Sequence, residues 1–459
     1  MKPLSVKHMR TILAGELIQG SDDVMIHNGA YRLDQVKKRH TIFFSRKRIV
    51  DWGNLKKFFP LVLVTDQEIS LKEDLKDLTV IKVEDTEMAY WHFVNFYRSQ
   101  FDIPVIAVTG TAGKTTVKEM IKHILSFNNN VVATKNSKNT RTVHLQYLLS
   151  IDDQTEAAVF ETAVGAPGDM EIAGAYFKPT IGIITNIGAH HLGLCKTLDS
   201  YIKEKGNMAK ILDQNGILII NTDDVNIGKI DLKPFYGRII KVGKDSSCHF
   251  RATDIQFQKD GMQFQLQHEE QRYSIFVPGL GEHQVYNALA ALAAVHEIGV
   301  NLSEAADRLK TFKKFDRQLQ VIEGINGSTL LDDTWSLTST SLEAALKVLK
   351  EFGKDKKKIA VIGSIKGLGA WGSTIHKQAG EMIATHEVDI LITIGILARI
   401  IADYAENSNL NLQVYSFEHT IPAYYLLKRL ADEETIILVK GDMYTKPIIE
   451  LAAKIRKEQ

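Results

Sequence analysis

A short run of glycine, lysine and threonine is the part of this sequence best suited to chemistry. It lies between an apolar run at residues 103–108 and an amphipathic segment, and position 108 holds valine where the usual spacing has glycine. Glycines let backbone N–H groups surround phosphate oxygens, Lys114 can reach the β- and γ-phosphates, and Thr115 can ligate magnesium. We therefore predict a loop that binds ATP and Mg²⁺. Its residues are Thr109, Gly110, Thr111, Ala112, Gly113, Lys114, Thr115 and Thr116.

Two other polar groups directly follow apolar runs of the same region. Glu161 comes after residues 157–160, and the segment 185–191, which ends in His191, comes after residues 180–184. The carboxyl ends of parallel strands meet at one edge of a sheet, where metal ligands and phosphate loops also lie. We expect both side chains near the loop; the alternative for each is a solvent-exposed strand-end residue.

The elements that must position these groups alternate between short apolar runs and helical segments. The helix predicted after the loop has an apolar face, Val117 to Leu125, at three- and four-residue spacing, and a further run lies at residues 216–220. This order is typical of a parallel α/β sheet. Alternating residues around Asp260-Gly261 predict an antiparallel hairpin beside it.

A second alternating series predicts another domain. Apolar runs at residues 328–331, 358–362, 389–394, 412–415 and 435–439 are separated by helical segments, which indicates a Rossmann-like fold. Helices are expected at residues 287–299 and 302–312 before that series begins. We place the domains at residues 1–100, a small α/β domain, 101–315, a central P-loop domain, and 316–459, a Rossmann-like domain.

The overall composition narrows the classes of protein. Of 459 residues, 44% are hydrophobic and 24% charged, as in ordinary globular proteins, and the net charge is +1. We therefore expect no nucleic-acid partner and no membrane insertion. With two cysteines, Cys195 and Cys248, and a start lacking the pattern of a signal peptide, the sequence favours a cytoplasmic protein.

Taken together, these motifs resemble the Mur ligase superfamily, three-domain ATP-dependent amide-forming ligases, over essentially the whole chain. The phosphate loop, the strand-end glutamate and the Thr-Asn-Ile-Gly segment ending in histidine occur in the family's order. The same order continues with Lys205, His283, Asn287, Arg317 and Asp332-Asp333. The resemblance implies the three-domain α/β architecture of that family.

The resemblance also assigns roles to individual residues. It implies that Lys114 and Thr115 hold the ATP phosphates and one magnesium, and that Glu161 and His191 hold a second magnesium supported by Lys205 as an N-carboxylated lysine. It further implies that Asn287 contacts adenine and that Arg317 and Asp332 reach the nucleotide from the third domain. Lys114, Lys205, His191 and Arg317 would be catalytic. From the residues alone, an exposed helical lysine is the better interpretation of Lys205, and Arg317 could equally be a surface charge.

The reaction that the resemblance implies is ligation of a carboxylate to an amine. The carboxylate attacks the γ-phosphoryl group to give an acyl phosphate and ADP, and the amine then attacks the acyl carbon. The spacing of Lys205-Gly206, of residues 221–224 and of Lys440-Gly441 is most similar to members that add D-alanyl-D-alanine to UDP-N-acetylmuramoyl-tripeptide. The expected partners are this acceptor, bound by the first domain, and an amino acid or dipeptide, bound by the third.

Departures from the family's pattern concentrate in the substrate regions. They are the segments 31–44, 134–141, 332–341, 363–369 and 440–443, where residues of the family's pattern are replaced or missing. One alternative is therefore a divergent ligase of the same type that uses a non-muramoyl carboxylate acceptor. A second is a non-catalytic, nucleotide-binding regulatory protein, against which the presence of Lys114, Glu161, His191 and Lys205 argues.

Overall fold

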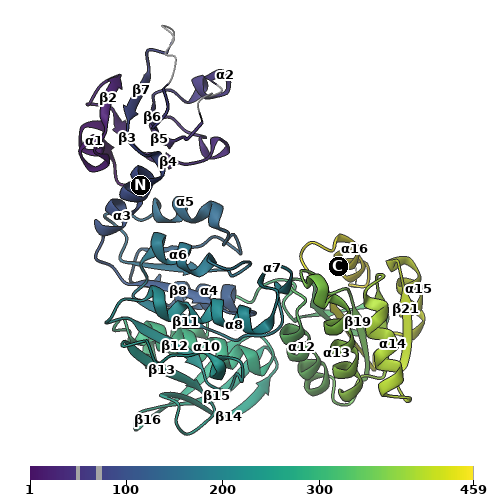
Figure 1. Ribbon diagram of the computed structural model, residues 1–459. Helices are drawn as coiled ribbons and strands as arrows, with labels where there is room; N and C mark the ends of the chain where they lie inside the picture. Colours follow the sequence, from purple (N-terminus) through teal and green to yellow (C-terminus); the bar gives the residue numbers. More distant parts are fainter. Residues whose placement is uncertain (48–51, 69–74, 458–459) are drawn as a thin grey trace.

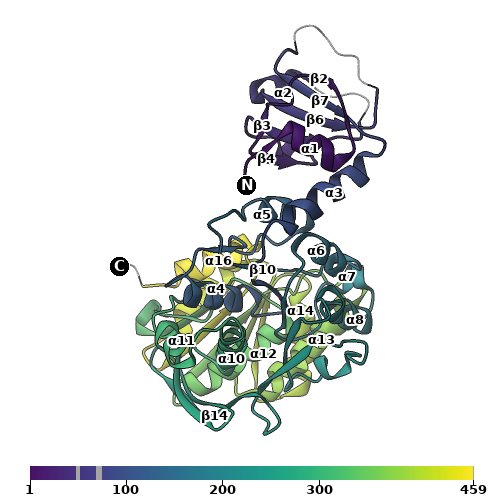
Figure 2. The ribbon, with the colours of Figure 1, turned by 90° about the vertical axis from the view of Figure 1, so that its left-hand side faces the viewer.

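The chain folds into three bodies, each built on one main β-sheet. The computed structural model describes residues 1–47, 52–68 and 75–457. The N-terminal body stands on the central one, and the C-terminal body lies beside it, so that the three enclose an open corner (Figures 1 and 2). Each sheet lies within one of the three ranges predicted from the sequence. The predicted mixed α/β fold with parallel sheets is confirmed.

The central sheet is parallel along most of its width and ends in an antiparallel meander around Asp260-Gly261, as the alternating pattern predicted. The parallel strands in the middle of the sheet are buried on both faces because helices cover both. In spatial order the strands are β9 (Val131–Ala133), β10 (Ala157–Glu161), β8 (Val105–Thr109), β11 (Ile181–Ile184), β12 (Ile217–Asn221), β13 (Arg238–Gly243), β14 (Phe250–Gln258), β15 (Gly261–His268) and β16 (Gln271–Pro278).

The helices of the central domain include the predicted one after the phosphate loop. They are α4 (Lys114–Leu125), α5 (His144–Leu148), α6 (Asp169–Phe177), α7 (Leu192–Cys195), α8 (Leu198–Gly206), α9 (Met208–Ile211), α10 (Glu282–His296) and α11 (Leu302–Leu309). Helix α10 begins at Glu282, earlier than the predicted residue 287. The apolar pattern missed its first turn because the polar residues His283 and Gln284 there line a cleft.

The C-terminal sheet is parallel except for its first strand. β17 runs antiparallel to β18, and β18 to β22 are parallel, as the second alternating series predicted. In spatial order the strands are β17 (Gln320–Glu323), β18 (Thr329–Asp333), β22 (Thr435–Lys440), β19 (Lys357–Ile362), β20 (Ile390–Ile394) and β21 (Gln413–Phe417). The helices are α12 (Ser339–Phe352), α13 (Gly372–Thr385), α14 (Ala398–Ser408), α15 (Thr420–Leu430) and α16 (Lys446–Lys454).

The N-terminal sheet is smaller, with one antiparallel edge strand. Its strands in spatial order are β2 (Glu16–Gln19), β7 (Leu78–Lys82), β6 (Leu61–Thr65), β5 (Thr41–Phe44) and β4 (Asn28–Ala30), and β1 (Leu4–Ser5) pairs separately with β3 (Met25–Ile26). The helices are α1 (Val6–Leu13), α2 (Trp52–Leu55) and α3 (Thr86–Ser99). Helix α3 leads down into the central domain (Figure 2).

The N-terminal and central domains share a hydrophobic core. Phe93 and Tyr97 of α3 pack in one buried cluster with Leu145 of α5 and Phe160 and Phe177 of the central sheet and α6. The C-terminal domain has its own clusters, in which Leu280 is the only fully buried partner from the central domain among the described residues.

The central and C-terminal domains touch through α7. The Gly193 N–H donates to the carbonyl of Gly367 (3.4 Å), and the Trp371 indole donates to the carbonyl of Lys196 (2.5 Å). A Cβ on Gly369 would lie 2.7 Å from the Cα of Gly193, so this contact requires small residues. Of the described helices, none is long and apolar enough to cross a membrane.

Candidate active site

The phosphate loop joins β8 to α4 as predicted. Gly110 and Gly113 both have positive φ, 148° and 81°. A Cβ would lie 1.9 Å from Thr185 Oγ1 at the first position and 2.4 Å from Asn287 Oδ1 at the second, so both positions require glycine. The loop is braced by Asn186, whose carbonyl accepts from Thr111 N (2.8 Å) and whose Oδ1 accepts from Ala112 N (2.9 Å).

Lys114 opens helix α4 and lies at the loop's centre. Its Nζ donates to the carbonyl of Thr111 (3.2 Å). Burial lowers the pKa of Lys114, and the charge of Glu161 opposes that shift. An anionic ligand bound here would contact the amine and the loop and would be stabilised by the positive N-terminal end of the α4 dipole.

Thr115 and Glu161 lie in direct contact, as their places at the start of α4 and the end of β10 predicted. The Thr115 hydroxyl donates to Glu161 Oε2 (2.8 Å), and Asn139 Nδ2 donates to Glu161 Oε1 (2.6 Å). Ser137 Oγ lies 3.1 Å from the same hydroxyl. Glu161 is 2% exposed. Oxygen ligands of this kind suit Mg²⁺, which is bound through one or two carboxylates together with phosphate oxygens.

His191 lies in the same cleft, preceded by His190. Burial, followed by the charges of Lys114 and Lys205, lowers the pKa of His191 to about 4. The ring is therefore neutral near pH 7, the form that ligates metals. Nδ1 of His190 is buried and has no hydrogen-bond partner among the described residues. Within the described ranges no cluster of three or more His, Cys, Asp or Glu side chains forms a metal site; the predicted set contains only two such residues.

Lys205 of α8 lies beneath the phosphate loop and is fully buried. Its Nζ donates to the Gly110 carbonyl (2.8 Å) and lies 4.5 Å from the centre of the Tyr201 ring. Burial, reinforced by the charge of Lys114, holds the pKa of Lys205 well below its usual range. The exposed helical lysine considered from the sequence is thus not what the structure shows.

The C-terminal domain contributes a buried ion pair. Lys440 Nζ donates to Asp333 Oδ2 (2.6 Å) and to the Ser336 carbonyl (2.6 Å), and Lys440 is 1% exposed. Burial raises the pKa of Asp333, and Lys440 opposes that shift. Neither residue was among the predicted site residues, although both end neighbouring parallel strands, where they pair in register. That position is the signal that could have found them.

Arg317, Asp332 and Asn287 are placed differently from one another. Asn287 lines the cleft beside the phosphate loop. The Asp332 carboxylate instead accepts from Arg456 (2.5 Å) and from the Thr334 hydroxyl (2.7 Å), and it is fully buried. The Arg317 guanidinium lies 5.3 Å from the Trp335 ring centre. Asp332 and Arg317 are absent from the described lining of the cleft, whereas Trp335 belongs to it.

Several of these groups line one space of about 760 Å³, here called the interdomain cleft, which lies between the central and C-terminal domains. It brings together the phosphate loop, Glu161, His191, Asn287 and the Asp333–Lys440 pair. Near the pair, Lys366 and Asp442 also face one another (3.4 Å). The cleft thus offers a phosphate site on one wall and paired charges of both signs on the other.

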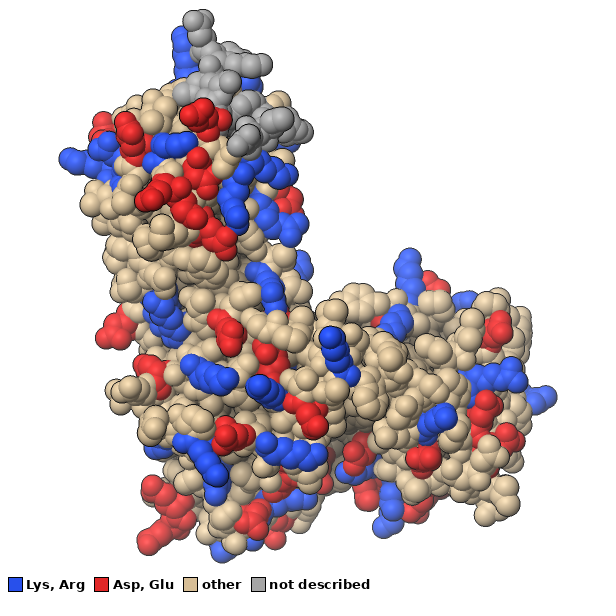
Figure 3. All heavy atoms as spheres, viewed as in Figure 1, with Lys and Arg blue, Asp and Glu red and all other residues tan. Residues whose placement is uncertain are grey.

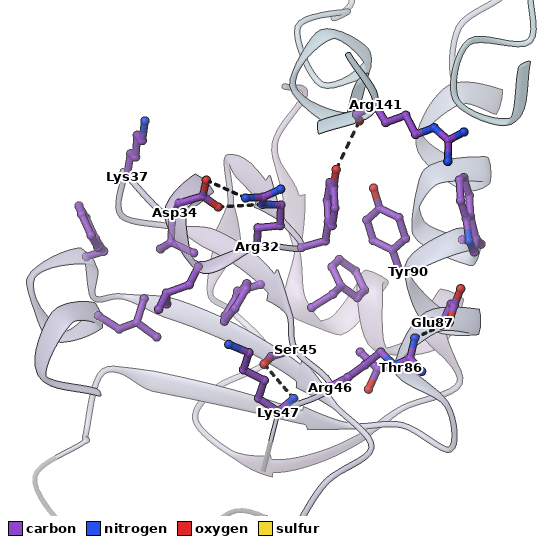
Figure 4. Close-up of a pocket in the computed structure, with 18 of the residues that line it drawn as sticks. Arg32, Asp34, Lys37, Ser45, Arg46, Lys47, Thr86, Glu87, Tyr90 and Arg141 are labelled. Atoms are coloured by element: carbon purple, nitrogen blue, oxygen red, sulfur yellow. Dashed lines mark hydrogen bonds and ion pairs between the residues drawn. The ribbon is translucent and has the colours of Figure 1, made fainter. Parts of the chain in front are cut away.

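A second space of about 1170 Å³, here called the N-terminal cavity, lies mainly in the first domain. Aromatic side chains such as Tyr90 form its walls, and charged side chains ring its mouth (Figure 4). Six cations line it against two carboxylates, which favours an anionic ligand. Blue side chains gather on the flank of this domain that faces the open corner (Figure 3). The cations are Arg32, Lys37, Arg46, Lys47, Lys57 and Arg141.

Comparison with known proteins adds to this geometry. Residues 108–295 match the Mur ligase middle domain. The chain is 29% identical over 329 residues to the UDP-N-acetylmuramoyl-tripeptide--D-alanyl-D-alanine ligase of Bacillus subtilis, covering 71% of this chain and 70% of that protein.

Solved structures show the same fold over nearly the whole chain. A crystal structure of MurF from Acinetobacter baumannii superimposes with a TM-score of 0.84 at 22% identity and covers 99% of both chains. Another structure from that organism, of UDP-N-acetylmuramoylalanyl-D-glutamyl-2,6-diaminopimelate--D-alanyl-D-alanyl ligase, has a TM-score of 0.78 at 22% identity and covers 99% and 98%. MurF of Thermotoga maritima in complex with ADP has a TM-score of 0.77 at 18% identity and covers 93% and 97%.

Proposed function

Because the chain carries the middle domain of the Mur ligases, we propose that it is an ATP-dependent, ADP-forming ligase that adds D-alanyl-D-alanine to UDP-N-acetylmuramoyl-tripeptide in peptidoglycan precursor synthesis. The observation that carries the proposal is the interdomain cleft, where Lys114 and the Thr115–Glu161 pair face the Asp333–Lys440 pair of another domain. One wall can hold ATP, and the opposite wall can hold an amine substrate. The relative from B. subtilis is named for the same reaction.

The residues present fit Mg²⁺ and ATP. The glycines that the loop requires at positions 110 and 113 leave room for phosphate oxygens, and Thr115 and Glu161 place two oxygen ligands side by side. When bound, Mg²⁺ would neutralise charge on the phosphates. Thr115 and Glu161 would hold it, with Glu161 fixed in turn by Asn139. We assign His191 to a second magnesium and Asn287 to the adenine, as the family resemblance implies.

In the first step the acceptor carboxylate attacks the γ-phosphorus of ATP, and the bond to the β-phosphate oxygen breaks. The products are an acyl phosphate and ADP. Lys114 lies where it can neutralise the transferring phosphoryl group. In the second step the amine attacks the acyl carbon, and inorganic phosphate leaves as the amide forms. Lys366, Asp442 and the Asp333–Lys440 pair can hold a substrate that carries both an amine and a carboxylate. Arg317 and Asp332 would join the nucleotide only after a change in domain arrangement.

We further propose that Lys205 is N-carboxylated. Its Nζ is buried beside the loop, and its lowered pKa favours the free amine, the form that combines with CO₂ to give a carbamate and a proton. A carbamate would turn this buried amine near Lys114 into an anion that can support a metal. The cytoplasmic location also stays a prediction from composition.

A divergent acceptor or amine is the second candidate. The strand-end loop that follows Asp333 reads Thr-Trp-Ser, and Trp335 takes part of the cleft wall. The remainder of the loop contains no asparagine up to Ser341. These residues face the place that we assign to the amine, so the altered chemistry there favours a different incoming amine over a different reaction.

The decisive experiment measures phosphate release from Mg-ATP with neither substrate, with each alone and with both, followed by mass analysis. The proposal expects release that requires both UDP-N-acetylmuramoyl-tripeptide and D-alanyl-D-alanine, together with the amide product. Release that depends on a different carboxylate or amine would support the divergent ligase. ATP binding with no turnover on any carboxylate–amine pair of a broad panel would contradict ligase function.

A further inference from the structure

Arg141 is the one described residue that lines both the N-terminal cavity and the interdomain cleft. It belongs to the central domain, in the loop between β9 and α5, and its side chain is 42% exposed. From there it reaches over the mouth of the N-terminal cavity above Tyr90 (Figure 4). Arg141 therefore lies beside both the cavity and the cleft that contains the phosphate loop, where it can contact a ligand that extends from one to the other.

The loop that carries Arg141 contacts both sites directly. At one end, Ser137 and Asn139 contact the Thr115–Glu161 pair in the interdomain cleft. At the other end, the Tyr31 hydroxyl donates to the Arg141 carbonyl (3.3 Å). Two residues span at most about 7 Å, so Arg141 lies within that distance, measured along the backbone, of the residue that holds Glu161.

The guanidinium of Arg141 has donors left for a ligand. Its Nε donates to Asp169 and its Nη2 donates to the carbonyl of Pro167 (3.0 Å), while Nη1 has no partner among the described residues. Asp169 is shared, since Oδ2 also accepts from the backbone N–H groups of Gly165 (2.8 Å) and Ala166 (2.6 Å). The free edge of a fixed guanidinium matches the two oxygens of a carboxylate.

The acceptor named for the A. baumannii ligase contains such a group. Its peptide is alanyl-D-glutamyl-2,6-diaminopimelate. A glutamyl residue has two carboxyl groups. One forms the amide bond to the next residue, and the other stays a free carboxylate within the peptide. This free carboxylate lies between the sugar nucleotide and the reacting end.

Resting on the proposed function, we propose that Arg141 is a specificity-determining residue that binds the internal carboxylate of the acceptor peptide between the N-terminal cavity and the interdomain cleft. It thereby selects acceptors that carry an anion at this point and aligns the peptide toward the phosphate loop. Arg32 lines only the N-terminal cavity and pairs with Asp34 (3.0 Å), which makes it a matched control.

The test compares UDP-N-acetylmuramoyl-tripeptide with its analogue in which the glutamyl carboxylate is a carboxamide. Calorimetric titration without ATP gives Kd, and ADP release gives KM and kcat. Wild-type protein should bind the carboxylate form about 10- to 100-fold more tightly, as a charge-assisted pair does. Arg141→Gln should bring that ratio close to one, Arg141→Lys should retain part of it, and the KM for ATP should stay unchanged.

The control variant separates selection from general binding. Arg32→Gln should weaken both acceptors by the same factor and keep the wild-type ratio. An unchanged ratio in Arg141→Gln, equal weakening of both acceptors by that variant, or no preference in wild-type protein would each overturn the inference. If wild-type protein shows the preference but releases no ADP, the proposed function fails while the role of Arg141 in binding stands. If Arg141→Gln does not fold, the wild-type and Arg141→Lys ratios decide.

Discussion

The Asp333–Lys440 pair of the interdomain cleft is buried, whereas the Arg46–Glu87 pair at the rim of the N-terminal cavity is exposed to solvent. Lys440 is 1% exposed where it pairs with Asp333, but the side chains of Arg46 and Glu87 are 67% and 58% exposed where they pair (2.5 Å). Buried charges hold their geometry and are costly to leave unpaired, while exposed pairs contribute little to stability. The cleft therefore fixes reacting groups, and the cavity attracts an anion without fixing it tightly.

This difference predicts how the kinetics divide. Substitutions in the interdomain cleft should lower kcat, because they remove interactions with the transferring phosphoryl group. Substitutions at the rim of the N-terminal cavity should raise the KM for the acceptor and leave kcat nearly unchanged.

Lys114→Ala gives the largest expected effect and tests the cleft directly. It removes the amine at the centre of the phosphate loop, and we expect turnover to fall by about 1000-fold or more. Circular dichroism and thermal melting should show an intact fold. A folded variant with undiminished, substrate-dependent ADP release would break the assignment of the cleft.

Lys205→Ala should lower kcat by about 100-fold, in the range of residues that support metal ligands. A small carboxylic acid or bicarbonate should restore part of the activity if the lost group is a carbamate. Lys203→Ala, on the same helix but exposed, is the matched control and should have little effect. Unchanged activity in Lys205→Ala would show that Lys205 has no role in catalysis. A loss of activity without rescue would indicate that Lys205 acts structurally and is not carboxylated.

His144 tests the wall between the two spaces through stability. It lines the interdomain cleft, packs its ring 5.5 Å from that of Tyr176 of the N-terminal cavity, and is 3% exposed. Burial lowers its pKa to about 4. Between pH 6.5 and pH 5 the imidazole is therefore protonated more in the unfolded chain than in the native state, and the free energy of unfolding should fall by about 1.6 kcal/mol from this residue.

Urea unfolding of wild-type protein and of His144→Leu at several pH values measures this contribution. The variant should lose less stability than wild-type protein as the pH falls from 6.5 to 5. Parallel curves for the two proteins would show that His144 is protonated to the same extent in both states.

Arg46→Gln gives the smallest expected effect and sharpens the contrast. Because its charge is exposed, we expect the KM for the acceptor to rise about 3-fold at low salt, with kcat unchanged. In 0.5 M salt the difference should nearly vanish. A large fall in kcat would show that the rim takes part in the chemistry.

The sequence predicted the parts of the site that depend on a continuous segment or on the regular pairing of parallel strands. The phosphate loop needs only one continuous segment between a strand and a helix, and the strand-end position of Glu161 follows from parallel pairing. Asp332 and Asp333 show the limit. Successive residues of a strand point to opposite faces, and only the third-domain packing shows that Asp332 meets Arg456 while Asp333 meets Lys440. Arg141 lines both the N-terminal cavity and the interdomain cleft only because of where the first domain docks, and no local sequence pattern specifies that position.

The hydrophobic core that α3 shares with α5, Phe160 and Phe177 also determines which domains can be exchanged between related proteins. The first two domains should melt as a single cooperative unit, because neither can lose its structure without opening that core. The C-terminal domain, which joins the central domain through contacts such as the buried Leu280, the glycine contact at α7 and the Trp371–Lys196 hydrogen bond, is the separable part. Replacing the residues after 315 with the third domain of another ligase should thus change the amine specificity. The chimera should keep the acceptor selection of the first two domains.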